Sequence, residues 1–545
     1  MPVKHRGLVA SDQKLPDRWL FGLCARYPVV MTSLWLETRK APTAAELHTV
    51  DTSTKPDVVI VGAGLTGLVC GLECARAGLS VAVFDARGVA EVTTGLTTAK
   101  ATCLQGAKTS EIAREHGSEA AREYVAVNQS ALSWLREFCA GAGVEVQTRT
   151  AYTIAQHGSS LETLEREADA ASAAGLQVDF SRGAPLDFVP FPIAGFVGLN
   201  DQAQFNPVDL ANALASEIRE LGGGIYQGIR VEGVSTSGTL TVHTTHGDIV
   251  TDRVVLATGT PILDRGGFFA KLEPQRSYLA AFAVPNGTLQ PEGMYVSIDS
   301  PDVAPTRSLR SAPGHLLVGG NGHIVGRAAN TRACARDLLT WTSHYFPEVA
   351  PTHQWSAQDY SSVDGLPVVG ALTPASDKVL IASGYAKWGM TNAVAAGRIL
   401  AERISDNAAD SGGTMPGAEL FDSQRSLAVR RMPNFAVTNA KVGVNAIKSW
   451  TQLARTLPQA PTEGEGVVHR HQLKPVATST VDGETRTVSA ICPHLKALLC
   501  WNSAERSWDC PLHGSRFSAD GTLLEGPATH DLASAPSPEW KGSGN

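Results

Sequence analysis

The chain has 545 residues, of which 43% are hydrophobic and 18% are charged, and it contains 52 glycines. This is the composition of a globular protein, and the length allows several domains, so disorder, collagen and small disulfide-stapled folds are excluded. The 46 basic residues are outnumbered by 53 acidic ones, which gives a net charge of −7. No basic surplus therefore points to nucleic acid as a partner.

The N-terminal residues carry no clear membrane or export signal. Their strongest apolar stretch, residues 19–36, is interrupted by Arg26 and Pro28, so we expect neither a spanning helix nor a signal peptide. Residues 1–30 are interpreted as an upstream start extension before Met31, within a polar lead-in that ends at residue 55. Six of the nine cysteines are scattered along the chain, which is typical of reduced thiols. We therefore expect a cytoplasmic protein without a membrane partner.

A glycine-rich turn between a predicted strand and a predicted helix is the first functional motif. Residues 57–61 form a β-branched run typical of a buried strand, residues 62–67 read Gly-Ala-Gly-Leu-Thr-Gly, and a helical stretch follows to about residue 77. A second buried strand over residues 81–84 ends at Asp85, 18 residues after Gly67. This order and spacing indicate a βαβ unit that binds a dinucleotide.

Each residue of this motif has an expected task. Gly62 makes the tight turn, Gly64 lets the backbone approach a pyrophosphate, and Gly67 allows the helix to pack closely on the strand. The N-terminus of the helix offers free N–H groups and a positive dipole end to the phosphates. Asp85 is placed to bind a ribose hydroxyl group.

Three further segments favour a flavin over a nicotinamide. Residues 91–100 are rich in small and hydroxylated side chains, and Ala257-Thr258-Gly259 resembles a turn of two-dinucleotide-binding flavoproteins. Residues 384–391 resemble the segment that packs a helix N-terminus against the flavin in glycine oxidase and D-amino acid oxidase relatives. We therefore expect non-covalent FAD. The predicted cofactor-binding residues are Gly62, Gly64, Gly67, Asp85, Thr94, Thr97, Thr98, Ala99, Val231, Gly259, Gly384, Gly389, Met390 and Thr391.

The rest of this region reads as mixed helices and strands. Helices are predicted over residues 107–140, 161–174 and 206–221, and strands crowd residues 225–258, 277–298 and 315–319. Residues 378–404 give a strand, a turn and a helix. The glycines of residues 320–326 also follow a strand, but their spacing is one residue off that of a nucleotide-binding loop. We interpret them as a structural turn and not as an NADPH site.

Cysteine and histidine occur in two short motifs near the C-terminus. Cys492-Pro493-His494 and Cys510-Pro511-Leu512-His513 are separated by 15 residues. A [2Fe–2S] cluster with two Cys on one iron and two His on the other needs this ligand set. Zinc also binds two Cys and two His, but zinc fingers keep the cysteines together and the histidines together. The split pairs therefore predict an iron–sulfur cluster held by Cys492, His494, Cys510 and His513.

Residues 467–535 resemble the Rieske domain in these motifs and in Trp508, Gly514-Ser515 and Gly526-Pro527. High-potential Rieske domains carry a disulfide between the two cluster loops, at positions that are Ala497 and Leu512 here. The resemblance therefore implies a cluster without that bridge, although Ser515 still offers a hydroxyl group. We expect a reduction potential in the lower half of the Rieske range of roughly −150 to +300 mV.

Together these segments resemble an FAD-dependent oxidoreductase of the D-amino acid oxidase and glycine oxidase-like family with a C-terminal Rieske domain. The resemblance implies an α/β fold: a GR2-type Rossmann-like FAD-binding domain with an inserted mixed-sheet substrate domain, followed by a small all-β domain. The expected parts are an N-terminal lead-in, the oxidoreductase, a helical and linker region, and the Rieske domain, over residues 1–55, 56–405, 406–460 and 461–545.

The two cofactors together predict the reaction class. A flavin accepts two electrons, usually as a hydride, and a Rieske cluster passes one electron at a time. The resemblance implies an enzyme that passes electrons between a small-molecule substrate of amine or amino-acid type, FAD, the cluster and an external electron donor or acceptor. Tyr278, His323 and Lys387 are catalytic candidates because they lie in family-like segments, although a packing role is the simpler interpretation of each.

Two alternatives stay open at this point. The first is a redox carrier or sensor without catalysis. The second is a component of a Rieske-type oxygenase system, which needs an iron held by two histidines and a carboxylate. His243 and His246 lie close in sequence, but they are not in the helical spacing that such a site uses.

Overall fold

The structure is a computed structural model, and it describes residues 29–39, 52, 54–183, 186, 189–288, 290–405, 415–425, 459–472 and 474–536. Most of the expected start extension lies outside the described residues. Most of the helical and linker region at 406–460 also lies outside them.

A six-stranded sheet with the order β17-β18-β11-β1-β2-β7 forms the centre of the first part of the chain. Its parallel strands are β1 (Val58–Val61), β2 (Val81–Asp85), β7 (Gly224–Gln227), β11 (Arg253–Leu256) and β18 (Ser376–Ser383), and β17 (Val368–Thr373) pairs antiparallel to β18. Every residue of β1 is buried because both faces of the sheet are covered. This explains why its sequence is a continuous β-branched run.

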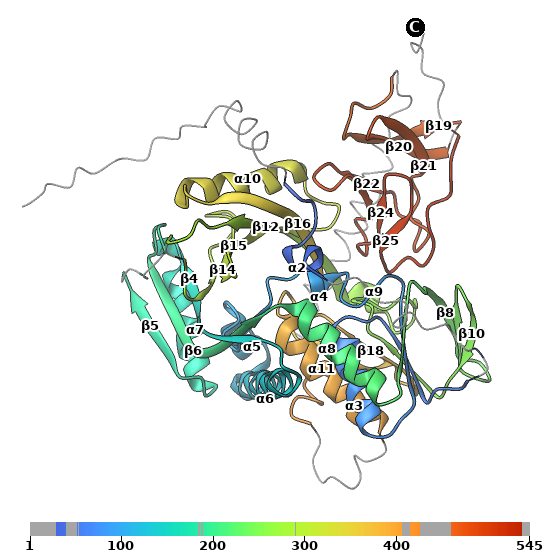
Figure 1. Ribbon diagram of the computed structural model, residues 1–545, viewed down its shortest axis with the longest axis horizontal. Coiled ribbons are helices and arrows are strands. Elements are labelled where there is room, and N and C mark those ends of the chain that lie inside the picture. Colours follow the sequence, from blue (N-terminus) through green and yellow to red (C-terminus); the bar gives the residue numbers. More distant parts are fainter. Residues whose placement is uncertain are drawn as a thin grey trace, which may run out of the picture.

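Helices cover one face of this sheet, and a small sheet covers the other (Figure 1). The covering helices are α3 (Leu65–Arg76), α8 (Pro207–Glu220) and α11 (Gly389–Ile404), with α5 (Lys108–His116), α6 (Ser118–Ala142) and α7 (Leu161–Ala173) beside them. The small sheet consists of β8 (Val231–Ser235), β9 (Thr241–Thr244) and β10 (Gly247–Val250). Val58 and Ile60 face the helices, whereas Val59 and Val61 face the small sheet.

A nine-stranded mixed sheet forms the second layer system, with the order β16-β12-β15-β14-β13-β4-β6-β3 and β5 paired to β6. Its only parallel pair among the described strands is β13 with β4. The strands are β3 (Lys100–Ala101), β4 (Val146–Ala155), β5 (Val178–Arg182), β6 (Gly195–Phe205), β12 (Leu272–Ala283), β13 (Met294–Ser297), β14 (Arg307–Ala312), β15 (His315–Ile324) and β16 (Ala350–Ser362). Helix α10 (Thr331–Tyr345) packs on β12 and β15.

The predicted turn at residues 320–326 is wrong for most of its length. Residues 320–324 continue β15, and only residues 325 and 326 form a turn. The glycines are needed for close strand contacts, because a Cβ on Gly320 would lie 2.2 Å from the carbonyl oxygen of Thr306. The prediction failed because a strand that needs glycine for close packing has a glycine pattern similar to that of a phosphate-binding loop.

The C-terminal part is all-β and has its own core, as predicted (Figure 1). One sheet consists of β19 (Gly466–His471), β20 (Lys474–Val481) and β21 (Glu484–Ser489), and the other of β22 (Cys500–Asn502), β23 (Ser507–Asp509), β24 (Arg516–Ser518) and β25 (Leu523–Glu525). Trp508 and Phe517 are fully buried between them. The predicted combination of an α/β fold, a mixed sheet and a small β domain is confirmed.

Candidate functional site

A cavity of about 460 Å³ is lined by residues of both large sheets and by residues 524–526, 528 and 529 of the C-terminal part. Eleven of the fourteen predicted FAD-binding residues line it. They are Gly62, Gly64, Asp85, Thr94, Thr97, Thr98, Val231, Gly259, Gly384, Gly389 and Met390. Segments that are more than 300 residues apart in the sequence therefore meet in one place, as the prediction requires.

The other three residues, Gly67, Ala99 and Thr391, lie outside the lining of this cavity. A Cβ on Gly67 would lie 2.0 Å from the carbonyl oxygen of Gly62, so this glycine serves the packing of α3 on the turn. The carbonyl of Ala99 accepts a hydrogen bond from Arg310 at 2.7 Å. Thr391 donates to Asn128 at 2.5 Å within the helical layer. A direct role for these residues at the cofactor stays a prediction.

The glycine turn presents bare backbone to the cavity. Gly62 has φ 109°, in the left-handed region, and a Cβ there would lie 2.5 Å from the carbonyl oxygen of Ala257. A Cβ on Gly64, the N-cap of α3, would meet only the Thr94 hydroxyl, at 3.3 Å. That hydroxyl accepts the N–H of Leu65 at 3.0 Å. The start of a twelve-residue helix thus faces the cavity with room for a phosphate group.

Asp85 is fixed by the same turn. Its two carboxylate oxygens accept the backbone N–H groups of Ala63 and Arg87, each at 2.8 Å. Burial raises the pKa of this carboxyl, and the two hydrogen bonds oppose that shift. Each oxygen keeps a lone pair that a ribose hydroxyl group can use.

Lys100 lines the cavity and was missed by the sequence analysis. Its ammonium group donates to the carbonyl of Tyr295 at 3.3 Å and to the hydroxyl of Ser308. Burial, and then the nearby guanidinium of Arg310, lower its pKa to about 7. Within the described ranges no carboxylate forms an ion pair with it. The only sequence signal was a single lysine that ends a run of small and hydroxylated residues.

Asp359 is a second missed residue of the lining. Its carboxylate accepts the backbone N–H groups of Tyr360 and Lys387. Burial raises its pKa to about 7, although the charge of Lys387 opposes the shift. Lys387 lies in a left-handed conformation with φ 73°. The cavity therefore contains a cationic and an anionic group that both titrate near neutral pH.

The three predicted catalytic candidates differ in their positions. Tyr278 and Lys387 line the cavity, whereas His323 does not. The Nε2 of His323 lies 3.3 Å from the hydroxyl of Tyr278, behind the lining. Burial raises the pKa of Tyr278, so its phenol is neutral at physiological pH. Whether any of the three acts in catalysis stays a prediction.

The four predicted cluster ligands lie together on two adjacent loops. The buried thiols of Cys492 and Cys510 are hydrogen-bonded to each other. The rings of His494 and His513 have their centroids 5.1 Å apart. Both Nδ1 atoms are buried without a hydrogen-bond partner within the described ranges. The site thus offers one pair of thiols and one pair of unpartnered imidazole nitrogens, which fits a cluster with two Cys on one iron and two His on the other.

Among the described residues no three His, Cys, Asp or Glu side chains converge on one metal position. His243, one of the two histidines considered for an oxygenase iron, pairs instead with Asp248 at 2.9 Å on the β9–β10 hairpin.

Backbone hydrogen bonds hold the two cluster loops. Cys492 donates its N–H to the carbonyl of Ala497 at 2.9 Å, and Cys510 donates to the carbonyl of Ser515 at 2.7 Å. The pKa of the Cys492 thiol is lowered mainly by its hydrogen bond with Cys510 and further by one with the Ser515 hydroxyl. The same hydroxyl accepts the N–H of Ala528 at 3.0 Å. These hydrogen bonds hold the two cluster loops in place, although the loops lack the disulfide of high-potential Rieske domains.

Two family models match the chain. The model described as "FAD dependent oxidoreductase" matches residues 57–403, and the model described as "Rieske [2Fe-2S] domain" matches residues 456–536. The predicted resemblance is confirmed. The descriptions also name the two predicted cofactors, FAD and a [2Fe–2S] cluster.

One relative matches this chain over most of both lengths. The Bacillus subtilis (strain 168) protein named "Putative Rieske 2Fe-2S iron-sulfur protein YhfW" is 27% identical over 486 residues, 88% of this chain and 93% of its own. Two solved structures share the fold of the first part at 18% identity and 68% coverage of this chain. They are glycine oxidase from Geobacillus kaustophilus (TM-score 0.57, 99% of that chain) and L-proline dehydrogenase from P. horikoshii (TM-score 0.56, 97% of that chain).

The described part of the chain has no helix that is long and apolar enough to cross a membrane.

A second cavity, also of about 460 Å³, lies beside the first, and Tyr278, Arg87 and Glu91 line both of them. Several of its walls are charged side chains of the C-terminal part, including Glu505 and Arg516.

Proposed function

Because the chain belongs to the FAD dependent oxidoreductase family and carries a Rieske [2Fe-2S] domain, we propose that it oxidises a small molecule at FAD. The Rieske domain would hold a cluster that supplies one-electron transfer to an external carrier. The observation that best supports this proposal is that the oxidoreductase and the Rieske domain both line the same cavity. Residues of the Rieske domain line the cavity that holds the predicted FAD-binding residues, so the two redox sites are neighbours in one chain.

The FAD would lie along the cavity with its pyrophosphate at the glycine turn. Gly62 and Gly64 supply the bare backbone, and Asp85 receives the ribose. Bound there, FAD supplies the capacity to take up a pair of electrons. The α11 N-terminus, which begins at Gly389 beside the cavity, stabilises negative charge on a bound ligand.

We propose an amino-acid-like substrate. A substrate carboxylate would provide Lys100 with the anionic partner that the described residues do not supply, and a substrate amine would find the carboxylate of Asp359 in the same cavity. Asp359 can also hold the proton that an ammonium group loses before oxidation, because its pKa of about 7 lies near physiological pH. The likeness to glycine oxidase and L-proline dehydrogenase agrees with this substrate class.

We assign the cluster to Cys492, Cys510, His494 and His513. The thiols would bind one iron and the Nδ1 atoms the other, and the cluster would supply one-electron transfer. The proposed boundaries are residues 56–405 for the oxidoreductase and 461–545 for the Rieske domain, and the two family matches support them. All eight described cysteines are free, which supports a reducing compartment such as the cytoplasm.

The test is anaerobic mixing of the holoprotein with a panel of amines and amino acids, with flavin and cluster absorbance followed separately. The proposal expects at least one compound to bleach the flavin first and the cluster second. Lys100→Met is expected to weaken binding of substrates with a carboxylate, and Lys55→Met serves as a control because Lys55 is half exposed and pairs with Asp252. A carrier or sensor without catalysis would not be reduced by any compound in the panel.

A further inference from the structure

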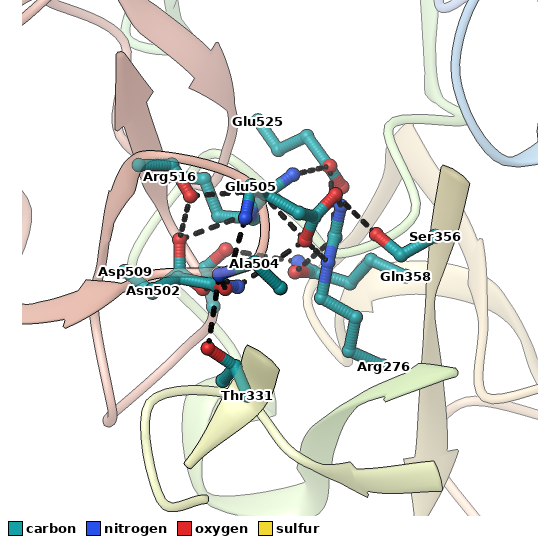
Figure 2. A network of polar contacts seen from close by, with 12 residues as sticks. Arg276, Thr331, Ser356, Gln358, Asn502, Ala504, Glu505, Asp509, Arg516 and Glu525 are labelled. Carbon is teal, nitrogen blue, oxygen red and sulfur yellow. Dashed lines mark hydrogen bonds and ion pairs between the residues drawn. The ribbon is translucent and has the colours of Figure 1, made fainter. Parts of the chain in front are cut away.

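A buried ion-pair network joins the mixed sheet to the Rieske domain (Figure 2). Arg276 of β12, with a side chain only 2% exposed, donates to Glu505 at 2.8 Å and to Glu525 at 3.1 Å. Ser356 of β16 also donates to Glu505. Both glutamates belong to the Rieske domain, whereas the arginine and the serine belong to the oxidoreductase. The contact therefore crosses the boundary between the two parts.

The Rieske domain has an arginine of its own in this network. Arg516 donates to Glu505 at 3.0 Å, to Glu525 at 2.7 Å and to Asp509 at 3.0 Å. Burial alone would raise the pKa of Glu505, but the guanidinium groups of Arg276 and Arg516 hold it well below its usual range. The network stays ionised at neutral pH. Undocking the domain would take a buried guanidinium away from two carboxylates.

Contacts at other points of the boundary bind the same two parts. Thr331 at the start of α10 accepts the N–H of Ala504 at 3.2 Å, and Arg332 pairs with Glu465 at 3.0 Å. The Nε2 of His494 donates to Asp264 at 2.6 Å. The Rieske domain is thus held along the boundary by polar groups that have their partners in the other part.

Gln358 of β16 lies between the two cofactor sites. It is 1% exposed, it lines the cavity, and its Nε2 donates to the carbonyl of Gly514 at 2.9 Å and to the hydroxyl of Tyr360 at 3.0 Å. Its Oε1 faces Arg276 at 3.5 Å. Gly514 follows the cluster ligand His513 directly. One side chain therefore lines the cavity and also contacts the loop that holds the cluster.

Gly514 is required for this approach. Its φ is 81°, and a Cβ there would lie 2.7 Å from Gln358 Nε2 and 2.7 Å from the Cβ of Pro274. Any side chain would push the cluster loop away from the oxidoreductase. The close approach of the His513 loop to the FAD cavity therefore depends on a glycine at position 514.

We propose that the Rieske domain is permanently docked by the Arg276 network and that Gln358 is a positioning residue that holds the His513 loop against the FAD cavity. This inference rests on the proposed function. FAD bound in the cavity would take up two electrons from one substrate molecule, and the two protons would be released to water. The Gln358–Gly514 contact would hold the cluster loop close enough for the electrons to pass one at a time, and an external one-electron carrier would accept each of them.

The experiment is flash photoreduction of the flavin in the full-length holoprotein, with the rate of cluster reduction read from absorbance. If the Rieske domain is docked, the rate of cluster reduction does not change with protein concentration or with added glycerol, because no domain movement precedes the transfer. Gln358→Met, which keeps the length but loses the N–H donor, is expected to slow the transfer at least tenfold while FAD content, iron content and both midpoint potentials stay unchanged. The matched control is Gln354→Met on the same strand.

Arg276→Met tests the docking separately and is expected to make the transfer rate fall as viscosity rises. A wild-type rate that depends on viscosity or on protein concentration would overturn the proposal without any variant. An unchanged rate in Gln358→Met would overturn the role of that residue. Failure of the proposed substrate class is distinguishable, because the flash experiment needs no substrate. Rapid transfer with no amine reducing the flavin would reject the substrate and support the docking.

Discussion

The carboxylate of Asp264, which follows β11 in the oxidoreductase, accepts a hydrogen bond from Nε2 of His494 in the Rieske domain at 2.6 Å. Asp264 is 43% exposed at its side chain, whereas that of His494 is 6% exposed. Asp264 of the oxidoreductase thus contacts the proposed cluster ligand His494 at Nε2, and the Nδ1 atom of that histidine stays unpartnered among the described residues. A metal-bound histidine is commonly tuned by such a partner.

Asp264→Asn is expected to raise the midpoint potential of the cluster. A negative charge next to the histidine stabilises the oxidised cluster, which is the more positive form, and its loss favours reduction. The shift should be on the order of 60 mV, equal to a tenfold change in a one-electron equilibrium. Protein-film voltammetry at neutral pH measures it. Asp248→Asn, which changes the partner of His243 instead, is the control, and a shift to lower potential in Asp264→Asn would contradict the argument.

The potential of the unmodified cluster should lie in the lower half of the Rieske range, roughly −150 to +300 mV. Ala497 and Leu512 cannot form the disulfide that accompanies high potentials, and Asp264 adds negative charge near the site. The Ser515 hydroxyl on Cys492 acts in the opposite direction. A redox titration followed by EPR of the reduced cluster decides the matter. A midpoint near +300 mV would show that the serine outweighs the other two effects.

Metal analysis should find two irons and two acid-labile sulfides per chain. This follows from the pairing of the two thiols and of the two unpartnered Nδ1 atoms. His513→Cys should change the EPR spectrum of the reduced cluster, since one histidine ligand of the iron becomes a thiolate. One zinc without sulfide, or an unaltered spectrum, would be incompatible with the assigned ligands.

Gly64→Val should yield folded protein without FAD. A Cβ at this position meets only the Thr94 hydroxyl at 3.3 Å, so the fold tolerates a side chain that blocks the pyrophosphate. Gly67→Ala differs, because its Cβ would lie 2.0 Å from the Gly62 carbonyl oxygen and would damage the fold itself. FAD released by denaturation and circular dichroism of each variant separate the two effects. Stoichiometric FAD in Gly64→Val would refute the placement.

Lys100→Met should stabilise the fold most at pH 7 and below. The pKa of Lys100 is 10.5 unfolded and about 7 folded. Between these two pKa values the unfolded chain binds more protons than the folded chain, so the free energy of unfolding of the wild type rises with pH. Above pH 10.5 Lys100 is neutral in both states, and burying it no longer costs the desolvation of a charge. The gain from the substitution, on the order of a few kcal/mol near neutral pH, should therefore shrink from pH 7 to pH 10. Thermal unfolding across this range tests it, with Lys55→Met as the exposed control.

Local motifs were predictable from the sequence because their chemistry depends on neighbours in the chain. The glycine turn before α3 and the split Cys–His pairs are of this kind, and the strand and helix around Gly62 follow from their hydrophobic pattern. The apolar runs of β1 and β2 likewise identified a sheet covered on both faces.

The remaining residues could not be predicted because their roles depend on distant partners. Lys100 gains its low pKa only when β3 is covered by residues such as Ser308, 208 positions later. Gln358 and Gly514 are 156 positions apart, and neither stands out in the sequence. The pairing of Arg276 with Glu505 was not predictable either, because nothing near Arg276 in the sequence indicates its partner 229 positions later.

The Arg276 network has a consequence for exchanging the two parts of the chain between proteins. A Rieske domain transplanted from another protein would leave Arg276 buried without Glu505 and Glu525, and one moved elsewhere would leave those glutamates without Arg276. A buried charge that loses its partner destabilises a protein by several kcal/mol. A chimera built at the boundary of the two parts would therefore need matched charges on both sides, although the sequence shows two separate domains.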